Sequence, residues 1–586
     1  MLKIFKYLKS KEWLQIAASL VFIVAQVWLD LKLPDYMSQI TMLVQTPGSA
    51  MSDIWKQGGY MLLCALGSVA SAIVVGFFAA RIAASFSQRL RSMLFSKVDS
   101  FSMEEINRFS TASLITRSTN DVTQIQMIVT MGLQLIIKAP IMAVWAVTKI
   151  AGKGFEWSLI TGAAVLILVA TIAFIMIFVM PKFRKMQTLT DNLNKITREN
   201  LTGLRVVRAY NAEAYQEEKF EKANDDLTGT HLYTSRGMAV MMPMMSMIMS
   251  GLSLAIYWIG AYLINNAEAM DKLAIFSNMV VFSSYAMQVI MSFMMLAMMF
   301  IILPRASVSA KRINEVLDTE PTILDGREHS GKPGHIGEVE FKNVSFKYPG
   351  AADYVLQNIS FTVKQGETIA FIGSTGSGKS TLINLVPRFF DVTEGEVLID
   401  GVNVKDYAGE SLFNKISYVP QKAVLFRGTV SSNVGYGENG KEAPTVDEIK
   451  RAVSIAQGTD FVESMNGQYE GDISQGGTNI SGGQKQRLAI ARAVCRKPEI
   501  YIFDDSFSAL DYKTDCILRR ALKEETAGVT SMIVAQRIGT IMDADQIVVL
   551  DEGRMAGKGT HKELLVSCEV YKEIAMSQFS EEELVS

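Results

Sequence analysis

The sequence predicts two domains: an all-α domain of six membrane-spanning helices, and a soluble α/β domain that follows it. The first observation is a change of composition near residue 305, before which long apolar stretches alternate with polar loops. The second is the length of 586 residues, which suggests several domains. Glycine and proline gather in the segment 318–337, which we expect to be a linker. We therefore place the membrane domain at residues 1–317 and the soluble domain at residues 338–586.

Bulk composition argues against some classes of function. The chain is 49% hydrophobic with a formal net charge of −2, so it lacks the basic balance typical of nucleic-acid-binding proteins. Its 4 cysteines show neither metal-ligand spacing nor a disulfide pattern, which suits a reducing cytoplasm. The residues from Met1 to Lys11 are cationic, but no cleavage site of small residues follows them. We interpret them as the uncleaved start of a membrane protein.

Six apolar stretches are long enough to cross a bilayer as helices, which takes about 20 residues each. Six crossings place both ends of the domain on one side. Lysines and arginines precede the first stretch and follow the second, fourth and sixth, so both termini are expected in the cytoplasm. The stretches are approximately Leu14–Leu33, Gly59–Ala80, Ile128–Val147, Ser158–Met180, Met241–Ile264 and Leu273–Leu303.

The two cytoplasmic connections, residues 81–127 and 181–240, are long and have the pattern of amphipathic helices. We expect helices two to five to extend well beyond the bilayer. A short turn is predicted at each tip, near Glu104–Ser118 and near Glu199–Tyr210. Each tip is either part of a solvated helical hairpin or a docking helix that touches a soluble domain and transmits its motion.

Charged residues inside the apolar stretches are unusual, because a charge at mid-bilayer costs roughly 2.5–3.5 kcal/mol on insertion scales. Lys138 lies near the middle of the third stretch, so we expect it to face protein or a water-filled path. Asp30 and Lys32 lie in the outer part of the first stretch, where we favour contact with headgroups. Gln134, Tyr285 and Gln288 are weaker candidates for lining a cavity.

Methionines crowd the fifth and sixth apolar stretches. Thioether side chains are flexible and polarizable, which suits a surface that accepts varied apolar ligands. The alternative is that they are ordinary lipid-facing or helix-packing residues. The two groups are Met238, Met241, Met242, Met244, Met245, Met247 and Met249, and Met279, Met287, Met291, Met294, Met295, Met298 and Met299.

A phosphate-binding loop follows a predicted strand at Thr368–Ile372. The motif G-x-x-x-x-G-K-[ST] stands between this strand and a helix from Lys379, which is its expected context. Its glycines let backbone N–H groups point at phosphate oxygens, and the helix adds its positive end. Lys379 is expected to reach the β- and γ-phosphates, and Ser380 to bind Mg²⁺. The predicted binding residues are Gly373, Ser374, Thr375, Gly376, Ser377, Gly378, Lys379, Ser380 and Thr381.

A second strand, Ile500–Phe503, has four apolar residues in a row and is expected to be buried. It ends in two carboxylates. After a phosphate-binding loop, such a strand usually carries Mg²⁺ on its first carboxylate, here Asp504, and a water-activating glutamate next. The second position of this chain is Asp505.

The segment Ile480–Gln484 contains Ser-Gly-Gly-Gln and precedes a basic, helix-prone run, Lys485–Arg496. Together with the phosphate loop and Asp504, it resembles the ABC ATPases, and nearly all of the chain resembles an ABC exporter half-transporter. The resemblance implies a six-helix membrane domain of the type I/IV ABC exporter fold, followed by an α/β P-loop nucleotide-binding domain that uses ATP and Mg²⁺.

The resemblance also implies roles for single residues. Tyr348 would stack on adenine, and Gln421 would sense the γ-phosphate and Mg²⁺ and contact the coupling helices. Asp511 would belong to the D-loop. In this family two nucleotide-binding domains pair head to tail, so each ATP lies between one subunit's phosphate loop and the other's signature. The signature residues would be Ser481, Gly482, Gly483 and Gln484.

Two departures from the family pattern fall on catalytic positions. Asp505 replaces the catalytic glutamate and is one methylene shorter, and Gln536 replaces the switch histidine. Glutamine can donate a hydrogen bond to phosphate but cannot carry positive charge near neutral pH. We expect ATP binding to survive and turnover at this loop to fail. Harmless drift is the alternative. The pattern resembles the degenerate-site subunit of a heterodimeric ABC exporter, whose partner would carry Glu and His and an altered signature.

The expected function is ATP-driven efflux of drugs or other amphipathic compounds across the plasma membrane, with the nucleotide-binding domain in the cytoplasm. We hypothesise that Lys138 faces the translocation path and biases its charge preference. A lipid or peptide exporter is the alternative within the same class. An ATP-gated regulatory or channel-like ABC protein is the alternative from another class. Membrane lipid and a second, non-identical half-transporter are the expected partners.

Overall fold

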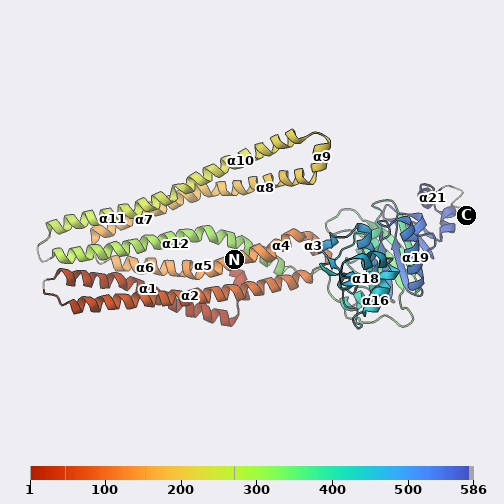
Figure 1. The fold of residues 1–586 in the computed structure, drawn as a ribbon, viewed down its shortest axis with the longest axis horizontal. Helices are drawn as coiled ribbons and strands as arrows, with labels where there is room; N and C mark the ends of the chain where they lie inside the picture. Colours follow the sequence, from red (N-terminus) through yellow and green to blue (C-terminus); the bar gives the residue numbers. More distant parts are fainter. Residues whose placement is uncertain (1, 47, 152–153, 269–270, 580–586) are drawn as a thin grey trace. The chain divides into compact units, whose positions relative to one another are not determined.

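The computed structural model describes residues 2–46, 48–151, 154–268 and 271–579 of the chain. It divides into two compact units (Figure 1). The first unit comprises Met1–Asp99 and Thr111–Thr319, and the second comprises Ser100–Ser110 and Glu320–Ser586. The second unit therefore includes a short segment from within the helical half of the sequence.

The first unit is built of helices, and 6 of them in the described residues are long and apolar enough to cross a membrane. This confirms the predicted six apolar helices. A 3-10 helix, η1 (Leu2–Tyr7), comes first. The first two spans are α1 (Ser10–Gln45) and α2 (Met51–Asp99), and the sixth is α12 (Lys272–Asp318). The other three spans each consist of consecutive shorter helices. The third comprises α4 (Thr111–Thr116), η2 (Arg117–Asp121), α5 (Val122–Gly132), η3 (Leu133–Ile137) and α6 (Lys138–Ile150). The fourth comprises α7 (Phe155–Phe174), η4 (Ile175–Val179) and α8 (Met180–Thr202), and the fifth comprises α10 (Glu213–Ala239) and α11 (Met241–Asn266).

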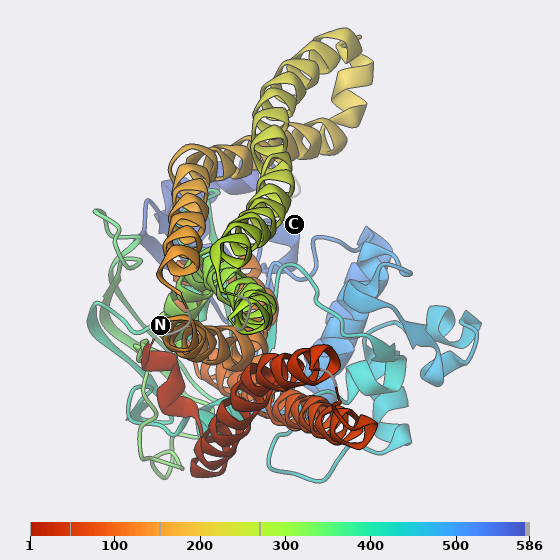
Figure 2. The same cartoon turned by 90° about the vertical axis from the view of Figure 1, so that its left-hand side faces the viewer.

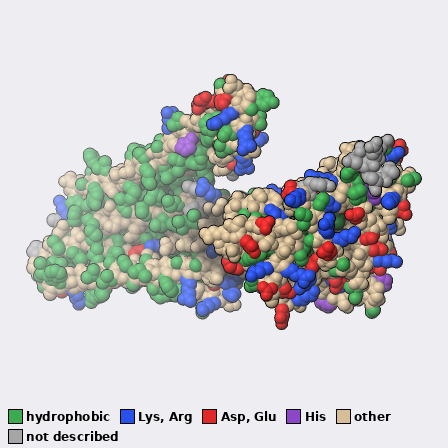
Figure 3. All heavy atoms as spheres, turned by 45° about the vertical axis from the view of Figure 1, so that its right-hand side comes forward, with side chains coloured by type: hydrophobic (Ala, Val, Ile, Leu, Met, Phe, Trp, Pro, Cys, Tyr) green, Lys and Arg blue, Asp and Glu red, His purple; other side chains and the backbone are tan. Residues whose placement is uncertain are grey.

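The helices run far past their apolar stretches, as expected. At 1.5 Å per residue, the 49 residues of α2 extend about 74 Å, more than twice the roughly 30 Å hydrocarbon core of a bilayer. Within the first unit, α1, α2, α5, α6 and α12 lie together, whereas α8 and α10 form a separate hairpin closed by α9 (Leu204–Ala209) (Figures 1 and 2). Hydrophobic side chains cover much of the surface of the first unit (Figure 3).

Asp30 is paired with Lys138, a contact that was not predicted. The Lys138 Nζ to Asp30 Oδ2 distance is 3.3 Å, and Ser68 donates a hydrogen bond to the other carboxylate oxygen of Asp30. Pro34, four residues after Asp30, has no N–H to offer the Asp30 carbonyl. Gln288 of α12 donates to that carbonyl instead, at 3.4 Å.

A second ion pair joins the same helices. Lys149 lies 2.8 Å from Asp35, and the Tyr285 hydroxyl donates to Asp35 at 2.7 Å and to the Leu31 carbonyl at 2.9 Å. Tyr285 is fully buried, so it packs between helices and does not line an open cavity, contrary to our expectation. Polar contacts therefore hold α1 against α6 and α12.

The methionine groups serve more than one surface. Met245 and Met279 are buried in the packing of α11 and α12, in line with the helix-packing interpretation. Met242, Met247 and Met298 are exposed on the first unit. The described methionines thus divide between helix packing and outward-facing positions.

The main sheet of the second unit has six strands in the order β12-β11-β3-β10-β9-β6. Neighbouring strands from β11 to β6 are parallel, and β12 is antiparallel to β11. All five residues of β9 are buried, which confirms the predicted buried strand. The strands are β3 (Thr368–Gly373), β6 (Ile416–Val419), β9 (Ile500–Asp504), β10 (Thr530–Val534), β11 (Gln546–Asp551) and β12 (Arg554–Gly559).

An antiparallel sheet of order β2-β1-β4-β5 packs into the same core, and a two-stranded sheet pairs β7 with β8. These strands are β1 (Val339–Phe346), β2 (Leu356–Val363), β4 (Glu394–Ile399), β5 (Val402–Asn403), β7 (Gly428–Thr429) and β8 (Asp472–Ile473). The helices are α13 (Lys379–Asn384), α14 (Gly409–Lys415), α15 (Val430–Val434), α16 (Val446–Ile455), α17 (Thr459–Ser464), η5 (Gln468–Glu470), η6 (Gln475–Gly477), α18 (Gly482–Arg496), α19 (Tyr512–Glu525), η7 (Ile538–Thr540), α20 (His561–Ser567) and α21 (Glu569–Met576).

The segment Ser100–Ser110 forms a short helix of the second unit, α3 (Met103–Phe109). Ser102 caps it, and Phe101 stacks on Phe109 with ring centroids 5.9 Å apart. A short turn was predicted at this tip, as part of either a hairpin or a docking helix, and the structure has a helix there; α9 lies at the tip of the second connection. Both tips therefore contain a short helix.

Candidate functional site

The candidate site lies where parallel strands of the main sheet end. In open α/β sheets, ligands bind in the crevice outside the carboxyl ends of the strands. Here β3 leads into the phosphate loop, β9 ends at Asp504, and Gln421 and Gln536 follow β6 and β10 within two residues. Because β3, β10, β9 and β6 are neighbours in that order, the predicted residues on their ends are brought together.

The phosphate loop has the backbone that its sequence predicts. Gly376 and Gly378 have φ of +89° and +96°, in the left-handed region that favours glycine. Lys379 folds over the loop, and its ammonium donates to the carbonyls of Gly373 at 2.9 Å and Ser374 at 2.7 Å. Burial lowers the pKa of Lys379, while Asp505 and Asp504 oppose this shift. The lysine is therefore placed at the loop that would hold phosphates.

Ser380 and Asp504 form the second part of the site. The Ser380 hydroxyl donates to Asp504 Oδ1 at 2.8 Å, and the Tyr418 hydroxyl donates to Asp504 Oδ2 at 3.3 Å. Burial raises the pKa of Asp504, and the hydrogen bonds from Ser380 and Tyr418 oppose the rise. A hydroxyl and a carboxylate at this distance supply the oxygen ligands that Mg²⁺ takes in nucleotide sites, so these residues fit the ion.

Asp505 lies at the centre of a hydrogen-bonded group. One oxygen, Oδ2, accepts from Gln536 Nε2 at 2.7 Å and from Gln421 Nε2 at 3.1 Å. Burial raises the pKa of Asp505, and hydrogen bonds from Gln421, Ser508 and Gln536 oppose the rise. In this structure Gln421 contacts Asp505 rather than the Ser380–Asp504 pair. The two catalytic candidates, Asp505 and Gln536, are therefore hydrogen-bonded to each other. Gln421, the predicted γ-phosphate sensor, donates to the same oxygen of Asp505.

Tyr348 lies beside the phosphate loop. Its hydroxyl is 3.0 Å from the Thr381 hydroxyl, and its ring packs edge-on against Phe346 and Phe390, with centroids 5.0 and 5.3 Å away. A pocket of about 190 Å³ borders Tyr348 and is also lined by Ser102 and other residues of the second unit. The aromatic ring predicted for adenine is therefore held next to α13.

The signature residues form a separate, exposed helix start. Ser481 caps α18: its N–H donates to Gln484 Oε1 at 2.8 Å, and its hydroxyl accepts from the Gln484 N–H at 3.3 Å. The backbone of Gly483 lies beside the Ala509 carbonyl, one residue from Ser508 of the D-loop. Asp511 caps α19 by accepting from the Thr514 N–H at 3.0 Å, which lowers the pKa of Asp511. These residues do not share the hydrogen bonds described around Asp505.

Two residues with a clear place in the site were not predicted. Tyr418 orients Asp504, and Asn384 of α13 accepts from the Tyr418 hydroxyl at 3.2 Å. The available signal was the position of Tyr418, three residues before Gln421 on a strand leading to the site. The order of the strands, which places β6 beside β9, could not be read from the sequence.

A phosphate loop, a carboxylate-ended strand and a Ser-Gly-Gly helix start define a P-loop nucleotide-binding domain, here fused to six apolar helices. A family model described as "ABC transporter transmembrane region" matches residues 16–293, and one described as "ABC transporter" matches residues 356–508. The chain is 40% identical over 522 residues to an uncharacterised ABC transporter ATP-binding protein of Mycobacterium tuberculosis, covering 89% of this chain and 87% of the relative. This chain belongs to the ABC transporter family.

Two further comparisons agree with this assignment. The chain is 31% identical over 493 residues to an ATP-dependent lipid A-core flippase of Pseudomonas aeruginosa, covering 83% of this chain and 79% of the flippase. The solved structure of a bacterial Atm1-family ABC exporter with ATP bound has a TM-score of 0.79 and 24% identity, covering 97% of this chain and 99% of that one. The chain is therefore a multi-pass membrane protein with an ABC exporter fold, and its family couples transport to hydrolysis of ATP with Mg²⁺.

Proposed function

We propose that this chain is one half of an ATP-driven exporter of drugs or other amphipathic compounds, and that its own ATP site is degenerate. A second, non-identical half would supply the competent site. The observation that carries the proposal is the Asp505–Gln536 pair, where both departures from the family pattern lie in direct contact at 2.7 Å.

The chemistry of the pair supports slow hydrolysis. Asp505 has a shorter reach than glutamate, and its Oδ2 already accepts from two amides. Gln536 cannot become charged as histidine can. A positioned general base contributes about 10²–10⁴-fold to a rate, so losing the base at this site should cost a factor in that range.

Nucleotide binding is expected to survive. Lys379, Ser380, Asp504 and the loop glycines are all present and grouped. Ser380 and Asp504, with Gln421, would hold Mg²⁺, which when bound neutralises negative charge on the β- and γ-phosphates. Tyr348 would stack on the adenine.

The exposed signature supports a role in a partner's site. Ser481–Gln484 begins the 15-residue helix α18, whose first N–H groups and positive dipole end favour phosphate. In the proposed pairing, this intact helix start faces the ATP held by the partner's phosphate loop. The chain would then bind one ATP and help the partner hydrolyse the other.

Two unpartnered apolar features support pairing of halves. The short helix α9 packs on α8 and α10 and leaves Val206 60% exposed, next to Tyr210, which is 80% exposed. In the second unit, a pocket of about 230 Å³ is lined by aromatic residues, including Phe389, Phe413 and Tyr436. We propose that α9 docks into such a pocket of the partner, and that the partner's equivalent helix docks here.

Exposed methionines of α11 and α12 suit amphipathic compounds of varied shape. A lipid exporter is the second candidate, because one relative is named as a lipid A-core flippase. We place the protein in the plasma membrane with both termini in the cytoplasm, on the basis of its Lys and Arg distribution.

The test uses the purified chain in lipid nanodiscs, alone and after co-expression with a complementary half. We expect the chain alone to bind ATP and hydrolyse it slowly, and the pair to hydrolyse it rapidly. Uptake of a cationic dye or of a fluorescent phospholipid into inverted vesicles separates the two substrate classes. Brisk hydrolysis by the chain alone, abolished by Asp505→Asn, would contradict the degenerate-site proposal.

A further inference from the structure

Glu105 of α3 makes hydrogen bonds to two separate parts of the second unit. The side chain is 2% exposed. Its Oε2 accepts from the N–H of Ser102 at 2.8 Å and from the Ser102 hydroxyl at 2.6 Å, which closes a capping box at the start of α3. Its Oε1 accepts from the N–H of Thr322 at 3.0 Å. The carboxylate therefore joins α3 to the segment that follows α12.

A second contact reinforces this connection. The hydroxyls of Ser102 and Thr322 are 3.1 Å apart. Burial raises the pKa of Glu105, but hydrogen bonds from Ser102 and Thr322 outweigh burial, so the pKa of Glu105 is lowered. The side chain thus remains a carboxylate, with both oxygens available as acceptors.

The position of these residues along the chain is informative. The chain passes between the two units three times: after Asp99, after Ser110 and after Thr319. Glu105 lies between the first and second passages, and Thr322 lies three residues after the third. Their hydrogen bond therefore joins, inside the second unit, the two segments of chain that form it: Ser100–Ser110 and the segment that begins at Glu320.

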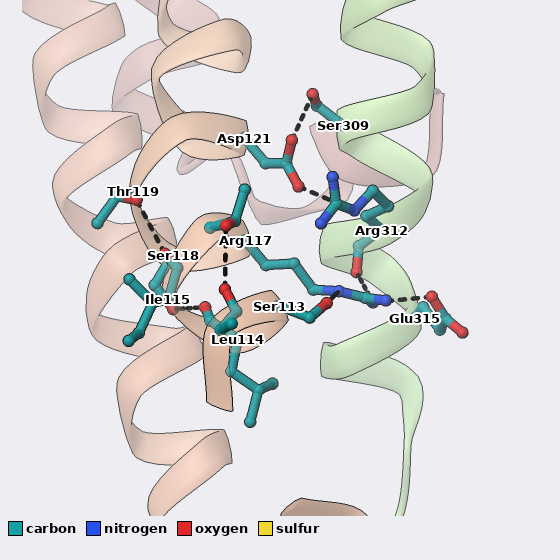
Figure 4. A network of polar contacts seen from close by, with 12 residues as sticks. Ser113, Leu114, Ile115, Arg117, Ser118, Thr119, Asp121, Ser309, Arg312 and Glu315 are labelled. Carbon is teal, nitrogen blue, oxygen red and sulfur yellow. Dashed lines mark hydrogen bonds and ion pairs between the residues drawn. The ribbon is translucent and has the colours of Figure 1, made fainter. Parts of the chain in front are cut away.

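The first unit joins two of these three connections, the second and the third, on its own side. Arg117, which follows the second passage, lies 2.7 Å from Glu315 and donates to the Arg312 carbonyl at 2.8 Å (Figure 4). Asp121 is 3.3 Å from Arg312 and accepts from the Ser309 hydroxyl at 2.8 Å (Figure 4). The third span and the end of α12 are thus held together shortly before they leave the unit.

We propose that Glu105 is a positioning residue for ATP-coupled transport, which binds the linker after α12 to α3 so that both move with the second unit. Motion of the nucleotide-binding unit then reaches the third span and α12 together. Without this bond, the linker can move independently of α3. Nucleotide binding then displaces α12 less. This inference rests on the proposed ATP-driven function and adds a residue to it.

One variant separates this role from simple helix capping. In Glu105→Gln, the single amide oxygen can still accept from Ser102, as Gln484 does from Ser481 at 2.8 Å in this same chain. The NH₂ group that replaces the second oxygen cannot accept from Thr322. The capping box survives and the linker bond is lost.

Two controls match this change. Glu563→Gln alters another capping box, in which Thr560 caps α20 and the Glu563 carboxylate accepts from the Thr560 N–H at 2.8 Å. A second test variant, Thr322→Pro, removes the N–H donor without changing Glu105. Its control is Thr322→Ala, which keeps that donor. If Glu105→Gln fails to fold, the Thr322 pair still tests the bond.

The experiment uses the full transporter in nanodiscs with two spin labels in the first unit. The labels are placed at the exposed first residues of α2 and α12, Met51 and Lys272. The distance between labels is measured with and without Mg²⁺ and a non-hydrolysable ATP analogue. We expect Glu105→Gln and Thr322→Pro to bind the analogue within twofold of wild type but to lose at least half of the distance response. Glu563→Gln and Thr322→Ala should keep it.

A full response in Glu105→Gln and Thr322→Pro would overturn the role of Glu105. An equal loss in Glu563→Gln would also overturn it, since capping alone would then explain the effect. A wild-type transporter that binds the analogue without any distance response would instead overturn the ATP-driven function, and the inference with it.

Discussion

Gln536 donates a hydrogen bond of 2.7 Å to Asp505, and these are the two residues at which the chain departs from the catalytic pattern of its family. The same carboxylate oxygen accepts from Gln421 at 3.1 Å. Two amides therefore hold one oxygen of Asp505, the residue that we propose stands in place of the catalytic base. The departures act as one hydrogen-bonded group, so changing either alone disturbs the other.

The first prediction concerns this pair. Replacing both residues by the family's pattern, Asp505→Glu with Gln536→His, should raise ATP hydrolysis by the chain's own site at least tenfold, within the 10²–10⁴ range of a positioned base. Each single change should achieve less, because the new side chain meets an unmatched neighbour. The measurement is phosphate release in nanodiscs, with the partner half's own catalytic site inactivated.

Lys379→Ala in the double variant is the control, because it should remove nucleotide binding and with it the gained activity. A double variant that binds ATP normally yet hydrolyses it no faster than wild type would show that the two positions do not limit turnover.

The second prediction concerns the signature. Ser481→Ala should reduce hydrolysis at the partner's site by tenfold or more, while the affinity of this chain's own phosphate loop for ATP stays unchanged. The matched control is Thr445→Ala, which removes an equivalent cap at the start of α16. Loss of a cap costs about 1 kcal/mol of stability in either case, so only the signature variant should lose activity. Equal activity losses in both variants would argue against a role in trans.

The third prediction concerns Mg²⁺. Asp504→Asn removes a charged oxygen ligand and should raise the Mg²⁺ concentration needed for tight ATP binding by about tenfold or more, as changes near a metal site commonly do. Tyr418→Phe is the control, because it removes only the hydroxyl that contacts Asp504 at 3.3 Å. Titration of ATP affinity against Mg²⁺ measures both. An unchanged Mg²⁺ requirement in Asp504→Asn would place the ion elsewhere.

The fourth prediction concerns the ion pair between Lys138 and Asp30. Breaking a buried pair leaves an uncompensated charge, so Lys138→Met should destabilise the protein by about 1–3 kcal/mol, less than a fully buried pair would cost. Lys138→Met with Asp30→Asn should recover much of this loss. Thermal unfolding in nanodiscs provides the measurement, and Lys32→Met on the same helix as Asp30 is the control. Failure of the double variant to recover stability would show that the pair is not coupled.

Much of the fold was predictable because its signals are local. The phosphate loop, the buried strand at β9 and the six apolar helices each follow from residues close together in the sequence. The Thr560–Glu563 capping box is another local signal, and α20 begins there. Apolar runs, capping residues and glycines act within one or two turns of chain.

The contacts between distant residues were not predictable. The sequence cannot show that α1 and α6 bring Asp30 within 3.3 Å of Lys138. The assembly of Gln421 and Gln536 on one oxygen of Asp505 depends on the order of β10, β9 and β6. The bond from Glu105 to Thr322 joins residues 217 positions apart. Such pairs are fixed by packing rather than by any local pattern.

The backbone of Asp505 has a φ of +46°, within the left-handed region that most side chains avoid. Aspartate occupies this region several times more often than longer or branched residues do. A glutamate at this position would have to adopt the same left-handed backbone, which longer side chains take up less readily. In the proposed arrangement of two unlike halves, the half that does not cleave ATP would have no need of the longer side chain. Its aspartate would then hold this turn at a lower conformational cost.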